Sequence, residues 1–390
     1  MKYYSVELNS KGNIAVDDSI LVKDSETTAG SRILEGFKSL FSAEAVERLE
    51  RCGYVLSGKT HVGEFGLDLV GEFSYYSDKE EVLKGAAAEL VAQKTVKGAL
   101  GVDVNGATRR AAALSDVCFL KPTYGTVSRY GVVSTAASGE TVGVYAKNTD
   151  DICEIMSSVA GYDEKDGTSL KNESYEYKNN LDVKDMKVCI IKELFDKTDD
   201  SIKAEINAFA ETLKAKGVVV EEISCNLFEI ANTAWQILMT AETCNNISRY
   251  DGVKFGHRAK EYKNIDELYV NSRTEGFNFL TKAVILYGSD VLSKNRYKDC
   301  FDKSLKIRRI VFDGLKEILS KYNAILTPVV SKGEFKAYDI KDAFTKVFEE
   351  SVFTSASSIT GMPALAFKKV QLMGDHFAES TLLSLAKEGE

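Results

Sequence analysis

Residues that bind metals are rare in this sequence. The chain of 390 residues has three histidines, far apart from one another, and seven scattered cysteines without a Cys-x-x-Cys pair. A zinc site uses closely spaced ligands of these types, so we expect no metal and no cofactor. The odd cysteine count and the absence of an apolar leader at the N-terminus predict reduced thiols in a cytoplasmic protein.

Long hydrophobic runs and an excess of positive charge are also missing. No apolar run approaches the roughly 20 residues of a membrane-spanning helix, so we expect no membrane association. The net charge is −8, with 50 basic and 58 acidic residues. This charge argues against direct nucleic-acid binding. No glycine-rich nucleotide-binding loop is present. At 44% hydrophobic and 28% charged residues, the composition is that of a globular protein with an ample core.

Strand and helix patterns alternate in the middle of the chain. Residues 188–191 and 218–220 are short β-branched runs, and residues 201–216 between them have the spacing of an amphipathic helix. This alternation is typical of α/β proteins. Residues 226–320 are mostly helical in pattern. We therefore expect one α/β domain over residues 1–390, with a mainly helical subregion at about 226–320.

The most distinctive stretch runs from residue 97 to residue 151. The apolar run at 99–104 predicts a buried strand, and the turn D-V-N-G-A-T-R at 103–109 follows it. Then come K-P-T-Y-G at 121–125 and S-R-Y-G at 128–131. This text resembles the signature region of the amidase signature family, in which G-S-D-T-G-G-S-I-R precedes G-L-K-P-T-Y-G-R-V-S-R-Y-G. The resemblance implies an α/β fold with a mixed, largely parallel central sheet flanked by helices.

The same resemblance implies where the family's Ser-cisSer-Lys catalytic triad would lie. The nucleophilic serine corresponds to Ala107, the second serine, in a cis peptide, to Leu83, and the basic lysine to Asp17. The methyl group of alanine has no lone pair and cannot attack an amide carbonyl. From pattern alone, Asp17 and Asp18 are two solvated carboxylates at a strand end, and Lys59 is a structural residue.

Two further stretches depart from the family pattern. Before the turn, the family's glycine- and serine-rich loop is shortened, and Ser77 or Asp78 can cap a helix through Val82 and Val91. After Pro363, the family's glycine-rich strand is missing from the text. We expect a different local structure at both places.

Residues 239–277 resemble one subfamily in particular, the glutaminase component of the tRNA-dependent amidotransferases, known as their A subunit. The resemblance implies B- and C-type subunits of such an enzyme as partners. The glutamine-binding tyrosine of the A subunit corresponds to Trp235, its carboxylate-binding arginine to Val284 and its acidic contact to Ser351. Valine cannot form the paired charged hydrogen bonds by which arginine holds a carboxylate.

These replacements together predict a degenerate, non-catalytic homologue that serves as a scaffold or regulatory partner. No catalytic residue is intact, and the positions of the former pocket are Val102, Asp103, Asn105, Gly106, Thr108, Arg109, Trp235, Val284 and Ser351. Two alternatives stay open. Thr108 could be a relocated nucleophile with Asp17 as its base, or the former pocket could bind a small molecule against an aromatic wall formed by Trp235.

Overall fold

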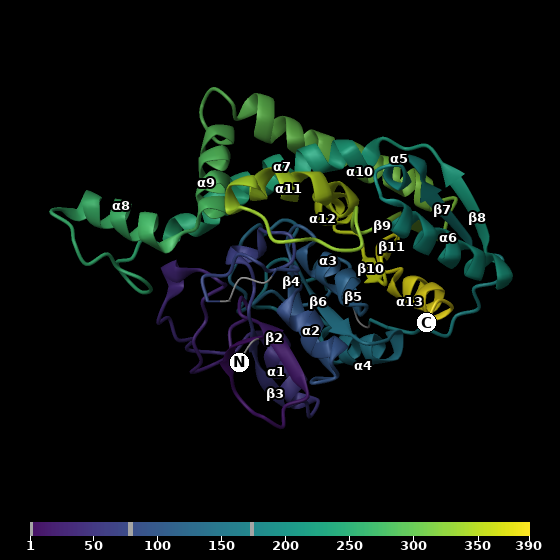
Figure 1. The fold of residues 1–390 in the computed structure, drawn as a ribbon, viewed down its shortest axis with the longest axis horizontal. Coiled ribbons are helices and arrows are strands. Elements are labelled where there is room, and N and C mark those ends of the chain that lie inside the picture. The colour runs from purple at the N-terminus through teal and green to yellow at the C-terminus, as the bar shows by residue number, and fades with distance from the viewer. Residues whose placement is uncertain (1–2, 77–80, 172–174) are drawn as a thin grey trace.

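The structure is a computed structural model that describes residues 3–76, 81–171 and 175–390 (Figure 1). Its described strands form one eleven-stranded sheet in the order β1-β3-β2-β4-β6-β5-β10-β11-β9-β7-β8. The strands are β1 (Tyr4–Glu7), β2 (Ile14–Asp17), β3 (Leu56–Thr60), β4 (Gly98–Asp103), β5 (Cys118–Lys121), β6 (Thr141–Ala146), β7 (Lys187–Ile191), β8 (Val219–Ile223), β9 (Ala324–Pro328), β10 (Ala364–Phe367) and β11 (Val370–Met373).

Helices flank this sheet, as expected for an α/β protein. The α-helices are α1 (Glu44–Arg51), α2 (Ala86–Ala92), α3 (Ala107–Leu114), α4 (Thr149–Val159), α5 (Lys192–Phe195), α6 (Asp200–Ala215), α7 (Leu227–Asn246), α8 (Ile265–Gly276), α9 (Phe279–Val291), α10 (Lys303–Leu319), α11 (Ala343–Glu350), α12 (Ser355–Thr360) and α13 (Glu379–Lys387). Short 3-10 or π turns are η1 (Arg32–Leu34), η2 (Glu64–Gly66), η3 (Ile247–Arg249), η4 (Lys298–Asp302), η5 (Ile340–Asp342) and η6 (Ser351–Phe353).

The two faces of the sheet are covered by different helices. On β4, Leu100 packs into a core that includes α1 and α4, whereas its neighbour Ala99 packs into a second core with α2 and α3. Successive side chains of a strand point to opposite faces, so a strand buried on both faces is apolar throughout. This explains the continuous apolar run that predicted β4.

The mixed α/β architecture is confirmed, but the sheet is less parallel than expected. Four of the neighbouring strand pairs are parallel and six are antiparallel. The β10–β11 pair is an antiparallel hairpin, whereas the antiparallel pair of β10 with β5 joins strands far apart in the chain. Short connections favour antiparallel pairing because parallel strands need a longer crossover.

Two local expectations are wrong. The chain does not lack a strand after Pro363, because β11 fills the place between β10 and β9. The helix expected through Val82 begins only at Ala86, since Val82 is extended and bridges to Lys336. The proposed caps Ser77 and Asp78 lie outside the described residues.

The expected helical subregion is present as α7 to α10. Figure 1 shows α8 projecting from the body of the molecule, with α9 leading back to it. Helix α7 packs against both α9 and α10. The described part of the chain has no helix long and apolar enough to cross a membrane. That residues 1–390 form a single domain stays a prediction.

Gly143 on β6 provides a test of the sheet packing. A Cβ atom there would lie 2.4 Å from the Leu120 carbonyl oxygen and 2.5 Å from the Phe119 ring. Neither the backbone nor a buried ring can move freely, so we expect Gly143→Ala to lower the free energy of unfolding by about 2 kcal/mol, measured by urea denaturation. The matched control is Gly167→Ala, where no atom lies within 4 Å. Equal stability of the two variants would contradict this packing.

Candidate functional site

The turn between β4 and α3 is built around Gly106. This residue has a φ of 86°, in the left-handed region that favours glycine, and it forms the N-cap of α3. A Cβ atom on Gly106 would lie 2.4 Å from Thr354 Oγ1, so the close approach also requires glycine. The turn therefore places Ala107 at the first position of α3, where the family's nucleophile would stand.

Asp103 and Arg109 hold this turn through a buried ion pair. Arg109 Nε lies 3.0 Å from Asp103 Oδ2 and Arg109 Nη2 lies 2.9 Å from Oδ1, and both residues are fully buried. Burial alone would raise the pKa of the Asp103 carboxyl, but the Arg109 charge holds it below its ordinary value. Arg109 also donates hydrogen bonds to Ser357 on α12 and Gln371 on β11. The pair thus fixes the turn to two later elements.

Thr108, the candidate relocated nucleophile, takes part in the same network. Its hydroxyl donates a hydrogen bond of 2.5 Å to Asp103 Oδ2. It has no hydrogen bond to Asp17 among the described contacts. Because the pKa of Asp103 is lowered, this carboxylate is a poor acceptor for the hydroxyl proton. The geometry therefore does not favour an activated Thr108.

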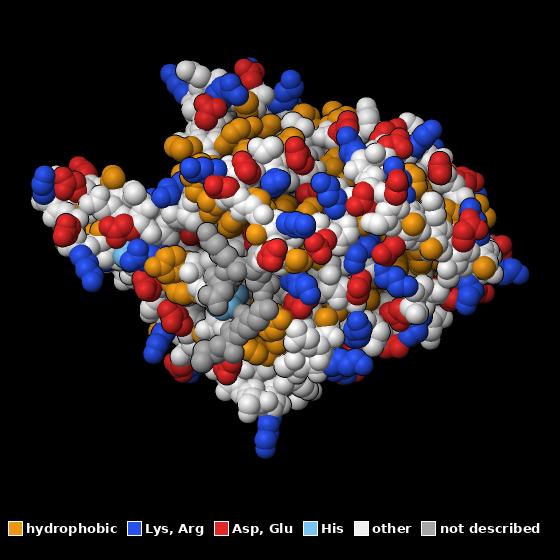
Figure 2. All heavy atoms as spheres, viewed as in Figure 1, with side chains coloured by type: hydrophobic (Ala, Val, Ile, Leu, Met, Phe, Trp, Pro, Cys, Tyr) orange, Lys and Arg blue, Asp and Glu red, His pale blue; other side chains and the backbone are white. Residues whose placement is uncertain are grey.

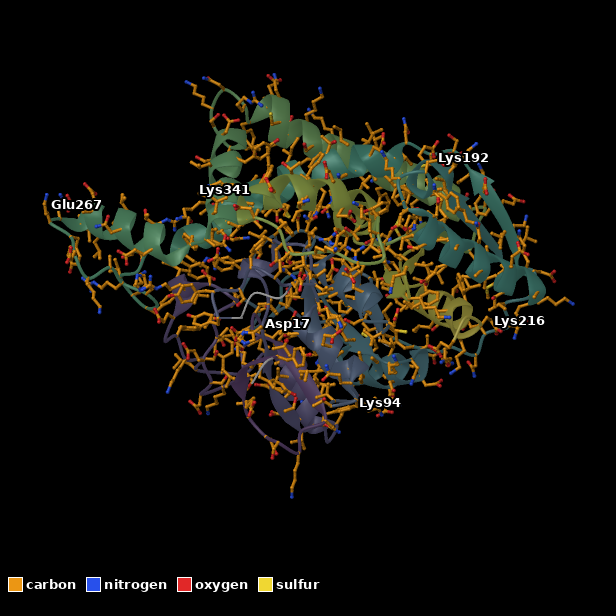
Figure 3. The ribbon with its side chains drawn as sticks, in the orientation of Figure 1. Asp17, Lys94, Lys192, Lys216, Glu267 and Lys341 are labelled. Carbon is orange, nitrogen blue, oxygen red and sulfur yellow. The ribbon has the colours of Figure 1, made fainter. Side chains whose placement is uncertain are left out.

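Asp17 is not a solvated carboxylate, contrary to the expectation from its pattern. It ends β2, which lies between β3 and β4, and its side chain is 5% exposed. It accepts hydrogen bonds from the Val102 N–H, at 2.9 Å, and from the Thr60 hydroxyl, at 3.1 Å. Burial raises the pKa of Asp17 to about 7. Figure 3 shows Asp17 within the body of the molecule.

The neighbouring Asp18 is buried as well. Its carboxylate lies 3.0 Å from Lys59 Nζ, and both side chains are inaccessible to solvent. Lys59 also donates a hydrogen bond of 2.8 Å to the Glu26 carbonyl oxygen. The expectation of solvated carboxylates is thus wrong for both aspartates, because only the sheet order puts β2 in the interior.

The four positions Asp17, Val102, Ala107 and Thr108 line one small cavity of about 30 Å³. A void of this size holds about one water molecule. Gly101 lies close to two of the lining residues, since a Cβ atom there would be 3.2 Å from Asp17 Oδ2 and 2.7 Å from the Tyr145 ring. Small-molecule sites are typically about 300–1,000 Å³, so this cavity is far too small for an amino acid.

Leu83 is buried but does not line this cavity. It belongs to the apolar cluster of α2 and α3, and its N–H donates to the Phe335 carbonyl oxygen at 2.9 Å. The peptide bonds of the described residues are all trans. Leu83 instead lines a larger neighbouring cavity.

Trp235 does not form the wall of an open pocket, contrary to the alternative interpretation. It is fully buried on α7, and its indole nitrogen donates a 3.1 Å hydrogen bond to Asn105 Oδ1. Its ring fills the space beside Gly139, where a Cβ atom would lie 2.1 Å from the indole. The indole therefore occupies interior volume next to the Asp103–Ala107 turn.

The other two carried-over glutamine contacts are also interior residues. Val284 on α9 is buried, and Ser351 donates a 2.6 Å hydrogen bond to the Val347 carbonyl oxygen. Neither lines the 30 Å³ cavity, nor do Asp103, Asn105, Gly106 and Arg109. Of the predicted site positions, only Asp17, Val102, Ala107 and Thr108 line a common cavity. The others are packed in or around the β4–α3 turn.

Sequence analysis missed three polar residues of this cavity, His61, Asp68 and Tyr145. Tyr145 on β6 pairs with Ala99 on β4, and burial beside Asp17 and Asp103 raises the pKa of its phenol. Asp68 accepts hydrogen bonds from the N–H groups of Gly71 and Phe73. A tyrosine in the largely apolar strand β6 could have indicated that Tyr145 has a functional or structural role. The local sequence around Asp68 gives no such indication. The part of the chain described here has no group of three or more potential metal ligands.

Comparison with known proteins identifies the family. The model of the amidase family matches residues 13–383, so the chain belongs to the amidase family. It is 34% identical to the A subunit of the glutamyl-tRNA(Gln) amidotransferase of Lachnospira eligens, covering 95% of this chain and 81% of that protein. The corresponding protein of Coxiella burnetii is also 34% identical, with the same coverage. The predicted family and the resemblance to the A subunit are confirmed.

Solved structures give the same result for the fold. The crystal structure of the glutamyl-tRNA(Gln) amidotransferase A subunit from Thermotoga maritima superposes with a TM-score of 0.82 and 28% identity, covering 99% of this chain and 86% of that chain. A 6-aminohexanoate cyclic dimer hydrolase superposes with a TM-score of 0.79 at 16% identity, covering 96% of this chain and 83% of that chain. At that identity, the likeness concerns the fold alone.

The buried Asp17 generates a prediction about pH. Its folded-state pKa of about 7 lies above its ordinary value of 3.8, so its contribution to stability is present at low pH and is lost as pH rises through about 7. Asparagine can accept from the Val102 N–H with its carbonyl oxygen and donate from its amide nitrogen to the Thr60 hydroxyl, without a charge. We expect Asp17→Asn to raise the free energy of unfolding by about 2 kcal/mol at pH 8 and to change it little at pH 4.

Urea denaturation at the two pH values measures this difference. The exposed Asp290→Asn, on α9, is the matched control and should show no such pH dependence. If Asp17→Asn destabilises the protein equally at both pH values, the carboxyl is not the buried acid that its environment implies.

Proposed function

We propose that this protein is a degenerate, non-catalytic homologue of the amidotransferase A subunit, with a role as a scaffold or regulatory partner. The observation that carries the proposal is the cavity beside Ala107, whose volume of about 30 Å³ is well below the usual range for small-molecule sites. The replaced triad positions support it, because the three groups act as a unit and none of them is retained. The family reaction would be glutamine amide hydrolysis that supplies ammonia for Glu-tRNA(Gln) or Asp-tRNA(Asn).

The packing around the turn supports the same proposal. Trp235 is hydrogen-bonded to Asn105, and Val284 and Ser351 are buried. Trp235 donates to Asn105 and Ser351 donates to the Val347 carbonyl oxygen, so both donors are used within the protein. A glutamine carboxylate would find no arginine at position 284, and desolvating it without a charged partner is unfavourable.

The proposed partners are amidotransferase B- and C-type subunits or another protein in the cytoplasm. The support is the identity to proteins named as subunits of an amidotransferase over most of their length. We also propose that residues 1–390 act as a single domain. A family fold that has lost its chemistry still presents the outer surface of that fold, and a surface can bind a partner without a catalytic site.

The alternative of an active enzyme with Thr108 as nucleophile has less support. The Thr108 hydroxyl is bonded to Asp103, and a catalytic arrangement tolerates displacements of only about 0.5 Å. Asp17 would have to accept its proton, yet the partners of Asp17 are Val102 and Thr60.

Glutamine turnover tests the proposal directly. We expect the purified protein to release glutamate and ammonia from glutamine at the rate of the buffer alone. Thr108→Val serves as the comparison, since it removes the one hydroxyl beside Ala107. Turnover by the native protein that Thr108→Val abolishes would establish the relocated nucleophile and refute the non-catalytic role.

Restoring the nucleophile alone should not restore activity. Ala107→Ser supplies a hydroxyl, but Asp17 stands in place of the basic lysine and Leu83 in place of the second serine. Catalytic residues that act together contribute non-additively, so we expect this variant to stay at the background rate in the same assay. A rate above background would mean that another base and proton relay serve this position, and the proposal would fail.

A further inference from the structure

A much larger cavity lies next to the 30 Å³ cavity beside Ala107. It has a volume of about 630 Å³, which is within the usual range for small-molecule sites. His61, Gly71 and Ala86 line both this cavity and the 30 Å³ cavity beside Ala107. None of Trp235, Val284 and Ser351 lines it, so it is distinct from the carried-over glutamine contacts.

Two carboxylates of this cavity are held by neutral hydrogen-bond donors. Glu64 is 3% exposed and accepts hydrogen bonds from the Ser31 hydroxyl, at 2.5 Å, and from the Asn278 N–H, at 2.9 Å. Glu72 accepts from the Tyr338 hydroxyl, at 2.5 Å, and from the N–H groups of two loop residues. Among the described residues, neither carboxylate forms an ion pair. Carboxylates withdrawn from water are normally paired with a cation, so this arrangement is unbalanced.

The other charged groups of the cavity do not correct the imbalance. Lys84 lies 3.4 Å from Glu89, and Glu275 lies 2.7 Å from His257, so each has a partner outside the lining. Asp339 adds a further negative charge at the exposed rim. The charges of Lys282 and Arg110 act on Glu64 and Glu72 from beyond ion-pair distance. Among the described residues of the lining, acidic side chains outnumber basic ones.

Aromatic rings form much of the remaining wall. Phe73 and Tyr338 meet edge to face with centroids 5.2 Å apart, and Tyr75 and Phe277 lie on other parts of the lining. The faces of aromatic rings attract cations, and the effect is larger where water is partly excluded. Rings beside unpaired carboxylates are the surroundings that an organic ammonium group favours.

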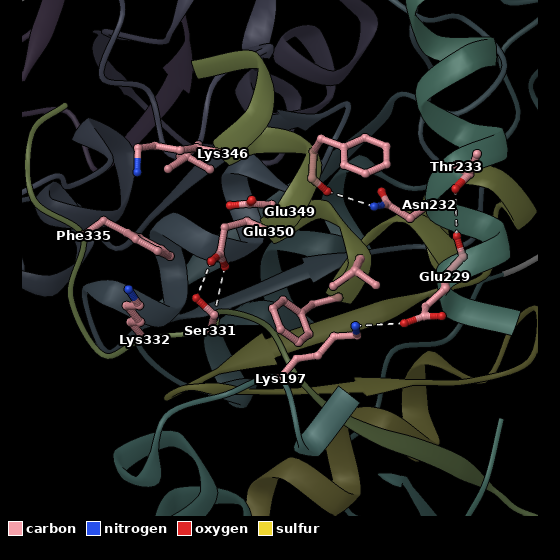
Figure 4. Close-up of a pocket in the computed structure, with 14 residues that line it drawn as sticks. Lys197, Glu229, Asn232, Thr233, Ser331, Lys332, Phe335, Lys346, Glu349 and Glu350 are labelled. Atoms are coloured by element: carbon pink, nitrogen blue, oxygen red, sulfur yellow. Dashed lines mark hydrogen bonds and ion pairs between the residues drawn. The ribbon is translucent and has the colours of Figure 1, made fainter. Parts of the chain in front are cut away.

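The second large cavity differs in this respect. It holds about 530 Å³ and is shown in Figure 4. There Glu229 forms an ion pair of 2.8 Å with Lys197, and Lys332 and Lys346 also line the wall. Its carboxylates are thus balanced by lysines of the same cavity, and a cationic ligand would gain less charge stabilisation there.

Figure 2 shows that acidic and basic side chains alternate over most of the visible face of the molecule. Such a mixed surface does not by itself select ligands of one charge, because neighbouring charges of opposite sign cancel over a short distance. A preference for cations must therefore come from a local arrangement such as the unpaired Glu64 and Glu72.

We propose that the 630 Å³ cavity binds a small organic amine, with its ammonium group at Glu64 and Glu72 and its apolar body against Phe73 and Tyr338. The ammonium would add a positive charge within the lining and donate hydrogen bonds to these carboxylates. This ligand site goes beyond the proposed non-catalytic role. Because binding is measured without glutamine, its failure would leave the turnover result unchanged.

Three probes of the same shape test the charge requirement on the unmodified protein. Benzylamine is a cation, benzyl alcohol is neutral and benzoate is an anion. Calorimetric titrations at pH 8 keep the Glu64 carboxyl ionised, because burial raises its pKa to about 7. We expect saturable one-to-one binding of benzylamine, with the other two probes at least about tenfold weaker. No saturable binding of benzylamine, or equal binding of all three, would overturn the proposal.

Two isosteric substitutions locate the site. Glu64→Gln and Glu72→Gln remove one charge each with little change in shape. At position 72 the new amide nitrogen cannot accept from one of the two backbone N–H donors. We expect each to weaken benzylamine binding about tenfold. The control is Glu349→Gln, which removes a carboxylate from the cavity of Figure 4 and should leave the affinity unchanged. Affinity unaffected by both cavity variants, or lost equally in the control, would refute the assignment. The three-probe comparison needs no variant, so a variant that fails to fold does not remove the test.

Discussion

The buried ion pair between Asp103 and Arg109 is the constraint on which the region around the site depends. Two charges without access to water are costly, and they remain stable only where each is fully hydrogen-bonded. Here the guanidinium bonds the aspartate, two serines of α12 and Gln371 of β11. Removing any partner would leave a buried charge unsatisfied. The pair therefore holds the β4–α3 turn, and with it Gly106 and Ala107, whether or not any chemistry occurs there.

This constraint accounts for two residues of the turn without reference to any catalytic chemistry. Gly106 is required by its backbone conformation and by Thr354, and Arg109 by the ion pair. Neither requirement involves a substrate. Position 107 has no such structural role, because a methyl group fills its place at the start of α3 without strain. The fold of the turn therefore depends on Gly106 and Arg109 and not on the side chain at position 107.

The surroundings of the turn form a packed interior. Trp235 occupies the space beside Gly139, and Tyr145 and Thr108 approach the space beside Gly101. Protein interiors are close-packed, so a void of one water molecule is what remains when side chains fill a pocket. The large cavity with Glu64 and Glu72 stays open beside it, because the segment around Tyr338 spans its edge instead of filling it. The small cavity beside Ala107 and the large cavity with Glu64 and Glu72 are therefore neighbouring but separate spaces.

The sequence by itself determined the family, the α/β class, the β4–α3 turn and the helical stretch from α7 to α10. These follow from local periodicity, from turn glycines and from text that must be retained for packing. It did not determine that Asp17 and Asp18 are buried, that Trp235 is inaccessible, or that a strand follows Pro363. Those features depend on which strands become neighbours, such as β2 between β3 and β4. Only the tertiary structure decided the burial and partners of each charged group, because these depend on residues far away in the sequence.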